Sequence, residues 1–243
     1  MVNLFSRAGS CHGYRDAENQ DAVLFRKNDR FSVITLADGI SVCSAARKGA
    51  EAACAAVTDI LVRKGGFFMK FDQGKTVDFL LSHILYELKK LAEQEGQAVE
   101  EYSSTIASVL VDHATGKMLC FSLGTSLILA AGNGRCRVLT VPSDSTEGCC
   151  CTTTVYAADM AQAVVTDAAA WDIVLICSDG AWRLMYDRGH LNEQVREMLL
   201  NQECARLECF IEEKECADDY SCISMNLQEL QRRQIYRGKT VSG

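Results

Sequence analysis

Two stretches of this chain share a pattern that could hold a metal ion, a short apolar run that ends at an aspartate and a glycine. The first is FSVITLADGIS (31–41), in which Asp38 and Gly39 end the run. The second is WDIVLICSDG (171–180), which ends at Asp179 and a glycine. β-Branched apolar runs of this length predict buried strands, and a carboxylate at a strand end is held more rigidly than one in a loop.

Two further aspartates stand beside predicted strands: Asp21 precedes one, and Asp218 precedes the last. Carboxylate oxygens suit Mg²⁺ or Mn²⁺, and two such ions about 3.5–4 Å apart can hold a bridging hydroxide and clamp a phosphoryl group. Taken singly, an Asp-Gly after a strand is more often a simple turn. The joint pattern favours one shared metal site, and the sequence contains no P-loop and no nucleophile elbow that would supply a different chemistry.

The composition excludes several other classes of protein. A net charge of −7 and a pI near 5.2 argue against nucleic acid as a partner. No apolar run reaches the roughly 18 residues of a membrane span, and the N-terminus lacks the apolar core of a secretion signal. We therefore expect a cytoplasmic monomer without a membrane partner. The 13 cysteines lack the spacing of a zinc site, so we expect mostly small buried side chains.

The secondary structure expected from periodicity and turn residues is mixed, with strands that follow one another and no βαβ alternation. Such an order predicts an α+β fold with antiparallel sheets and helices packed outside them. We expect one domain over residues 1–243, with a core at about 8–226 and a frayed tail at 227–243. The expected helices are 44–62, ended by the Gly65-Gly66 pair, then 76–95, a short one within 157–164, 191–200 and 205–213. The expected strands are 23–26 and 31–37 as a hairpin, a four-stranded meander at 105–111, 117–123, 127–131 and 135–141, and then 171–177 and 220–225.

Six short motifs occur in order along the chain and resemble those of a known family. They are ENQDA (18–22), LADGIS (36–41), STIASVLVD (104–112), SLGTS (122–126), LICSDGAW (175–182) and ADDYSCI (217–223). Together they resemble the type 2C (PPM) metal-dependent Ser/Thr protein phosphatases of the bacterial branch. The resemblance implies an αββα sandwich of two antiparallel β-sheets flanked by helices. It also implies hydrolysis of phosphoserine and phosphothreonine by a hydroxide that bridges two Mn²⁺ or Mg²⁺ ions.

The resemblance also assigns roles to the acids. Asp38 would bridge the two metals, and the carbonyl of Gly39 would bind one of them. Asp179 and Asp218 would hold the other metal, with Asp218 chosen because the aspartate after it fills an Asn-like position of the motif. Asp21 would act through water molecules bound to the metals.

In the first loop, the resemblance implies a basic residue that holds the substrate phosphate. Arg15 is the candidate, since a guanidinium matches phosphate oxygens in a bidentate way. His12 is a second candidate, either as a proton donor to the leaving alkoxide or as a solvated loop residue.

Three departures from the family pattern bear on activity. Ile40 and Ser41 stand where two glycines are usual, and Arg15 lies six positions before Asp21 instead of five. Thr125 replaces the aspartate that supports a third, weaker metal, so the sequence does not predict that ion. These departures keep open a weakly active or inactive module that binds a phosphoprotein or regulates a kinase. A hydrolase of small phosphate esters is a further alternative. The expected partner is a phosphorylated protein, either a Ser/Thr kinase or one of its targets.

Overall fold

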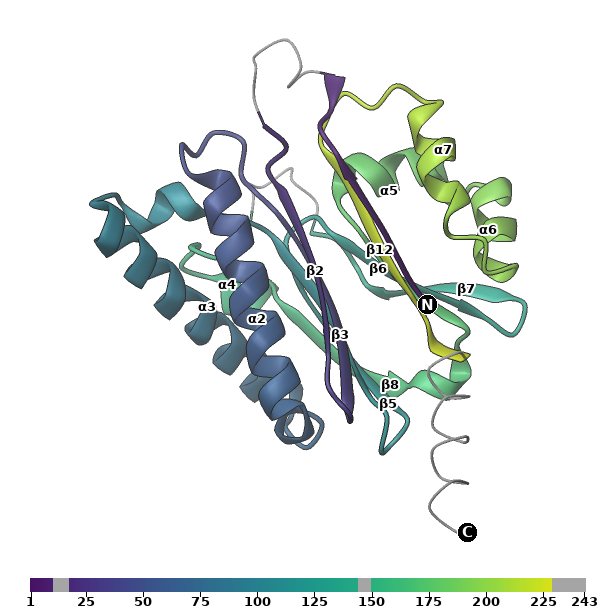
Figure 1. Cartoon of the computed structure of the whole chain (residues 1–243), viewed down its shortest axis with the longest axis horizontal. Coiled ribbons are helices and arrows are strands. Elements are labelled where there is room, and N and C mark those ends of the chain that lie inside the picture. The colour runs from purple at the N-terminus through teal and green to yellow at the C-terminus, as the bar shows by residue number, and fades with distance from the viewer. Residues whose placement is uncertain (11–17, 144–149, 229–243) are drawn as a thin grey trace.

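The computed structural model describes residues 1–10, 18–143 and 150–228. Two five-stranded antiparallel sheets pack face to face, with helices on both outer faces (Figure 1). One sheet has the order β2-β3-β4-β5-β8 and the other β1-β12-β9-β6-β7. The strands of the two sheets are β1 (Val2–Arg7), β2 (Asp21–Lys27), β3 (Phe31–Asp38), β4 (Ile106–Asp112), β5 (Lys117–Leu123), β6 (Leu127–Gly132), β7 (Arg135–Thr140), β8 (Gln162–Asp167), β9 (Ile173–Cys177) and β12 (Tyr220–Asn226). The α+β class and the αββα sandwich are confirmed.

Long helices cover the first sheet and short helices cover the second. The first sheet carries α2 (Ala46–Phe68) and α3 (Gln73–Glu95). The second sheet carries α5 (Asp179–Met185), α6 (Glu193–Leu200) and α7 (Arg206–Glu212). The remaining short elements are η1 (Val99–Tyr102), α4 (Ala157–Met160), η3 (Ala168–Ala170), β10 (Tyr186–Asp187) and β11 (His190–Leu191).

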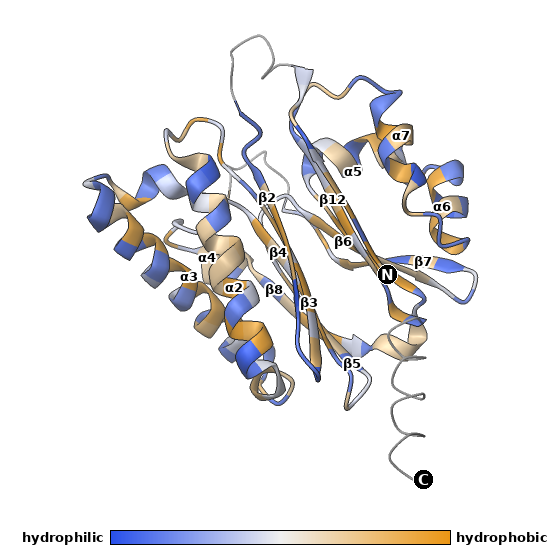
Figure 2. Ribbon diagram, viewed as in Figure 1, coloured by the Kyte–Doolittle hydropathy of each residue, from blue (hydrophilic) through white to orange (hydrophobic). Residues whose placement is uncertain are grey.

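Apolar side chains fill three layers, one between the sheets and one under each set of helices. Between the sheets, Ile34 and Val109 of the first sheet belong to the same buried cluster as Ile176 and Ile223 of the second. Because β3 is covered on both faces, every residue from Phe31 to Ala37 is buried. Its sequence therefore reads as a continuous apolar run instead of an alternating one. In Figure 2 the central strands are accordingly mostly apolar, whereas the helices carry both polar and apolar stretches.

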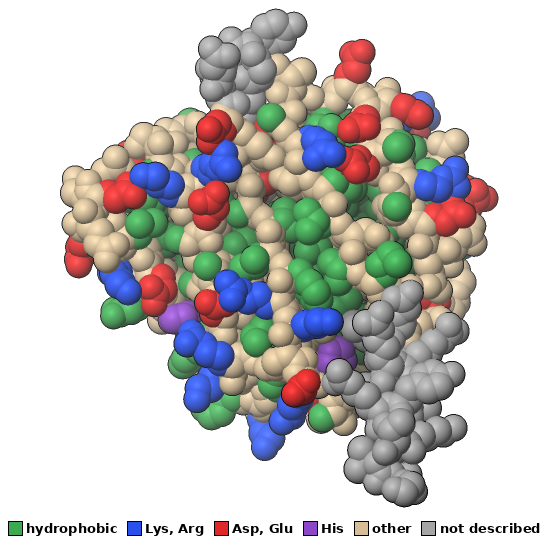
Figure 3. All heavy atoms as spheres, in the orientation of Figure 1, with side chains coloured by type: hydrophobic (Ala, Val, Ile, Leu, Met, Phe, Trp, Pro, Cys, Tyr) green, Lys and Arg blue, Asp and Glu red, His purple; other side chains and the backbone are tan. Residues whose placement is uncertain are grey.

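The edge strands β1 and β2 lie side by side at the open edge of the sandwich in Figure 1. Apolar side chains show between these edges, while acidic and basic side chains are interspersed over the rest of this face (Figure 3). Val2, Val23 and Phe25 are only partly buried and pack against the cluster between the sheets. Among the described residues, no helix has both the length and the apolar character needed to cross a bilayer.

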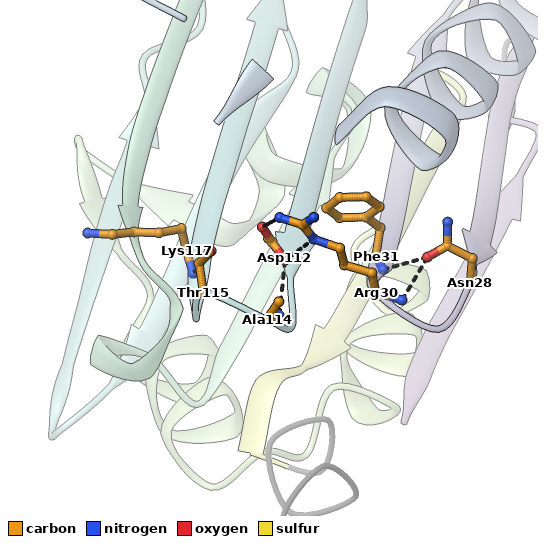
Figure 4. Close-up of polar contacts among 7 residues, drawn as sticks. All are labelled: Asn28, Arg30, Phe31, Asp112, Ala114, Thr115 and Lys117. Atoms are coloured by element: carbon orange, nitrogen blue, oxygen red, sulfur yellow. Dashed lines mark hydrogen bonds and ion pairs between the residues drawn. The ribbon is translucent and has the colours of Figure 1, made fainter. Parts of the chain in front are cut away.

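The predicted β2–β3 hairpin is confirmed, and its turn is pinned by side chains (Figure 4). Asn28 accepts hydrogen bonds from the backbone N–H groups of Arg30 at 2.9 Å and Phe31 at 2.7 Å. Arg30 in turn donates from Nε and Nη2 to the buried carboxylate of Asp112, at 3.0 and 2.8 Å. Burial alone would raise the pKa of Asp112, but hydrogen bonds from Arg30 and Ala114 and the charge of Arg30 lower it. This bidentate pair ties the turn to β4 and so contributes to the register of three strands.

The first long helix does not end at Gly65-Gly66, which corrects the prediction. α2 continues through both glycines to Phe68. A Cβ at Gly65 would lie 2.9 Å from a methyl group of Leu110 and 3.1 Å from the ring of Phe31. The glycine is required because the helix approaches the sheet closely there, and close packing leaves no room for a side chain. The second helix is confirmed, and Asp72 caps its N-terminus by accepting from the N–H of Lys75 at 2.9 Å.

The predicted four-stranded meander is wrong. β4 and β5 belong to the first sheet, and β6 and β7 pair in the second, so the chain crosses between sheets at residues 124–126. The short helix expected within 157–164 covers only Ala157–Met160, after which β8 pairs with β5. β1 was not predicted and pairs with β12 along its whole length.

Two further predictions concern the burial of the cysteines and the order of the C-terminal tail. The described cysteines are free thiols, and those in the apolar runs of the sequence, Cys54, Cys120 and Cys177, are buried as expected. The tail prediction falls mainly on residues outside the described part of the chain. At its start, however, Leu227 is buried and donates its N–H to the carbonyl of Asp172 at 2.8 Å, so the tail is held at that point.

Candidate metal centre

The first two predicted acids meet across one pair of strands. β2 begins at Asp21 and β3 ends at Asp38, and the two residues are direct partners in the antiparallel register. Side chains of directly opposed residues lie on the same face of a sheet, about 4.5–5.5 Å apart at Cβ. The hairpin therefore brings two carboxylates together at the strand ends far from its turn.

The backbone around Asp38 is fixed to the next strand. Its N–H donates to Oγ1 of Thr105 at 3.2 Å, and its carbonyl accepts from the N–H of Thr105 at 2.8 Å. Gly39 forms a further bridge with Ser104, and the N–H of Ile40 donates to the carbonyl of Ser103 at 3.0 Å. The residues around Asp38 are thus held by hydrogen bonds on both sides of the acid.

The other two acids come from neighbouring strands of the second sheet. Asp179 follows β9 and opens α5, while Asp218 comes just before β12. β9 and β12 are antiparallel neighbours, with Cys177 opposite Cys222, so the end of one lies beside the beginning of the other. Asp179 is partly exposed and Asp218 is exposed.

The charges of the other three acids act on Asp38, although Asp179 and Asp218 come from the other sheet. The pKa of Asp38 is raised well above its ordinary value, first by burial and then by the charges of Asp21, Asp179 and Asp218. Such charges act strongly only over short distances in a protein. The tertiary structure therefore brings together the four aspartates that the sequence singled out.

Asp21 is the most deeply placed of the four. Burial and the charge of Asp219 raise its pKa, hydrogen bonding from Ser221 and Ser178 lowers it, and the resulting pKa is about 7. Those hydroxyl contacts are poor, because both carboxylate oxygens of Asp21 are buried without a hydrogen-bond partner of acceptable geometry. A buried carboxylate of this kind is costly unless a cation neutralises it.

The donor set fits a hard divalent cation in its chemistry, since it consists of carboxylates and lacks sulfur and imidazole. Within the described ranges, however, no three acidic, histidine or cysteine side chains already stand in the spacing of an ion cage. The acids are gathered at one end of the sandwich, and their spacing is not that of a preformed site.

Asp219 has a different environment from its neighbour Asp218. It is buried, and its two oxygens accept from the N–H groups of Gly9 at 3.0 Å and Gln20 at 2.7 Å. These two residues flank the first loop, so Asp219 holds both ends of that loop beside β12. The Asn-like position in the motif was the sequence signal for this residue, but its anchoring role was not predicted.

The remaining predicted positions are His12, Arg15 and Thr125. His12 and Arg15 lie outside the described residues. Thr125 is buried, and its carbonyl accepts from Nε1 of Trp182 at 2.8 Å. A residue that the sequence reasoning missed is Arg183, whose Nη2 lies 3.3 Å from Oδ2 of Asp179. Its spacing of four residues from Asp179 on a helix was the available signal.

A family model described as Protein phosphatase 2C matches residues 8–212. The chain belongs to the protein phosphatase 2C family. The predicted family is thereby confirmed, and with it the class of protein serine/threonine phosphatases. No curated protein matches the chain.

Solved structures of several serine and serine/threonine phosphatases share the fold at low sequence identity. A bacterial serine phosphatase superposes with a TM-score of 0.69 at 13% identity, covering 93% of this chain and 97% of that one. Serine/threonine phosphatase Stp1 from Staphylococcus aureus gives 0.66 at 16% identity, covering 93% and 94%. The catalytic domain of PstP in complex with two manganese ions gives 0.66 at 17% identity, covering 93% and 97%. At these identities the likeness establishes the fold.

Proposed function

We propose that this protein phosphatase 2C member hydrolyses phosphoserine and phosphothreonine in a protein substrate, with two Mn²⁺ or Mg²⁺ ions. The observation that carries the proposal is the convergence of Asp21, Asp38, Asp179 and Asp218 at one end of the sandwich. Their mutual repulsion and the burial of Asp21 create a strong demand for positive charge.

In this proposal the four aspartates and the carbonyl of Gly39 hold the ions. Asp38 would serve both ions, Asp179 and Asp218 would hold one of them, and Asp21 would act through water. Ions bound there would supply Lewis acidity and would lower the pKa of bound water, which is the chemistry that hydrolysis of a phosphate ester needs.

The surrounding residues keep the acids in place. Thr105 accepts from the backbone N–H of Asp38 and donates to its carbonyl, which limits movement of the proposed bridging ligand. Asp219 anchors the ends of the first loop, which carries the proposed phosphate ligand Arg15 and the proposed proton donor His12. The expected substrate remains a phosphorylated protein, a Ser/Thr kinase or one of its targets.

The test is Mn²⁺-dependent hydrolysis of a phosphopeptide and of p-nitrophenyl phosphate by the purified chain. Asp38→Asn and Asp179→Asn should each remove most of the activity. Asp167→Asn is the matched control, because its carboxylate is exposed on β8 and pairs only with Lys117 among the described residues. Unchanged activity in Asp38→Asn would overturn the proposal.

A second candidate is a weakly active or inactive module that binds a phosphoprotein or regulates a kinase. Thr125 favours it, because a threonine cannot replace a carboxylate ligand. Calorimetry with Mn²⁺ beside a turnover assay separates the two candidates, since this module would bind phosphopeptide with little or no turnover. A panel of small phosphate esters tests the remaining alternative of a small-molecule phosphatase.

A further inference from the structure

Arg183 reaches the acid cluster from the exposed side of α5. Its Nη2 lies 3.3 Å from Oδ2 of Asp179, one helical turn earlier. About half of the Arg183 side chain is exposed (53%), against 18% for that of Asp179. One side of the guanidinium therefore pairs with a proposed metal ligand, and the side chain is also open to solvent.

The position of this guanidinium is set by an aromatic side chain. Arg183 lies over the ring of Trp182 at 5.6 Å, within the range of cation–π attraction. Trp182 is itself fixed, because its Nε1 donates to the carbonyl of Thr125 at 2.8 Å and its ring meets Tyr186 edge-on at 6.1 Å. The arginine is thus positioned by more than a flexible surface ion pair, which by itself contributes little.

The charges around Asp179 imply a competition. Asp179 acts on the half-buried Asp38 on one side and pairs with Arg183 on the other. A divalent cation bound to Asp179 would neutralise the carboxylate and weaken its attraction for the guanidinium. The freed guanidinium would then stand beside the metal site with its donors available, and its geometry matches two phosphate oxygens.

We propose that Arg183 is a phosphate-binding residue that pairs with Asp179 in the metal-free protein and binds the substrate phosphate once metal is bound. This inference rests on the proposed function. It predicts that bound metal increases the affinity of the protein for phosphate. It assigns a phosphate ligand on α5, separate from the first-loop candidates.

The experiment compares Arg183→Gln and Arg183→Lys with the wild-type chain of residues 1–243. Arg188→Gln is the control, since Arg188 is 94% exposed in the turn between β10 and β11 and lies beside Asp187 instead of the acid cluster. Isothermal titration calorimetry measures Mn²⁺ binding, and then inorganic phosphate binding to the Mn²⁺-loaded protein. Steady-state kinetics with a phosphopeptide gives KM and kcat.

Arg183→Gln should bind Mn²⁺ roughly twofold to fivefold more tightly at unchanged stoichiometry, because a competing cation is lost. It should bind phosphate about tenfold more weakly, with a matching rise in KM that exceeds the change in kcat. Arg183→Lys should recover part of the phosphate affinity, and Arg188→Gln should behave as wild type.

Unchanged phosphate affinity in Arg183→Gln would overturn the inference, as would weaker Mn²⁺ binding, which would indicate that the arginine only supports Asp179. A wild-type chain that binds Mn²⁺ and phosphate without turnover would contradict the proposed function alone, because the calorimetric comparison still decides the role of Arg183. A wild-type chain that binds no Mn²⁺ would overturn both.

Discussion

Asp21 and Asp38 are direct partners across the β2–β3 pair, so that two carboxylates share one strand end. Like charges placed opposite each other destabilise a sheet, and burial adds to the cost. At the other end of the same hairpin, Arg30 compensates the buried charge of Asp112. The acid pair therefore costs stability in the metal-free chain, as is common for residues that serve binding or catalysis.

Asp38→Asn should stabilise the metal-free protein while removing Mn²⁺ binding. The amide is isosteric and relieves the repulsion from Asp21, Asp179 and Asp218. We expect the free energy of unfolding at pH 8 to rise by about 1 kcal/mol or more, measured by urea denaturation in the presence of a chelator. Asp167→Asn on the exposed edge serves as control. A loss of stability in Asp38→Asn would show that the acid is neutralised in another way.

The stability of the metal-free chain should decrease as the pH rises from about 4 to 7. Burial raises the folded-state pKa of Asp21 to about 7, whereas an unfolded aspartate titrates near about 3.9. Within this window the folded state binds more protons than the unfolded state, so the free energy of unfolding falls with rising pH. The raised pKa of Asp38 acts in the same direction.

Thermal unfolding with a chelator at several pH values measures this effect. Asp21→Asn should flatten the profile, and the difference between the two chains isolates the contribution of Asp21 from other groups. Mn²⁺ should raise the midpoint more at pH 8 than at pH 5.5, because protons compete for the ligands. An identical pH profile in Asp21→Asn would refute the assignment.

Truncation of Asp219 should lower the stability of the protein, whereas truncation of Asp218 should weaken Mn²⁺ binding. Asp219→Ala leaves the N–H groups of Gly9 and Gln20 without their acceptors, so we expect a loss of about 2 kcal/mol or more in stability. Asp218→Ala should change stability little, because the side chain is exposed, but should weaken Mn²⁺ binding. Denaturation and calorimetry on both variants check this pair, and a reversed pattern would move the ligand role to Asp219.

Thr125→Asp should create a third metal site beside Trp182. Thr125 is buried next to the second sheet, so the new carboxylate should lower the stability of the metal-free chain. Calorimetry should show one more Mn²⁺ per chain than in the wild type, together with faster turnover. Thr125→Asn, which has the same shape without the charge, should show neither gain. Equal stoichiometry in all three chains would count against a third site at this position.

Gly180→Ala should displace the beginning of β12 and with it the acids before that strand. A Cβ at Gly180 would lie 2.1 Å from the carbonyl oxygen of Asp219, which is too close for backbone to tolerate. We expect a loss of about 2 kcal/mol or more in stability, together with weaker Mn²⁺ binding. Gly74→Ala in α3 is the control, since its new methyl group meets only Asp72 Oδ1 at 3.5 Å and should be neutral or stabilising. Equal stabilities for the two variants would contradict the packing argument.

The sequence by itself determined which segments are strands and helices over most of the core, and which aspartates stand at strand ends. These signals are local: the apolar run before Asp38, the spacing of Leu80, Ile84 and Leu88 on α3, and the turn at Asn28 all act within a few residues. For the same reason the Gly65-Gly66 pair was misread, because a glycine required by a distant Leu110 looks the same as one that ends a helix.

Only the tertiary structure decided how the strands are shared between the two sheets and which charges meet. β6 is buried along its whole length, and such a strand has the same apolar sequence in either sheet, so nothing local separates it from the meander that the turns suggested. Local sequence likewise does not show which of the acids meet. The approach of Asp179 and Asp218 to Asp38 depends on two sheets packing face to face, an arrangement set by the summed burial of many apolar side chains rather than by any one motif.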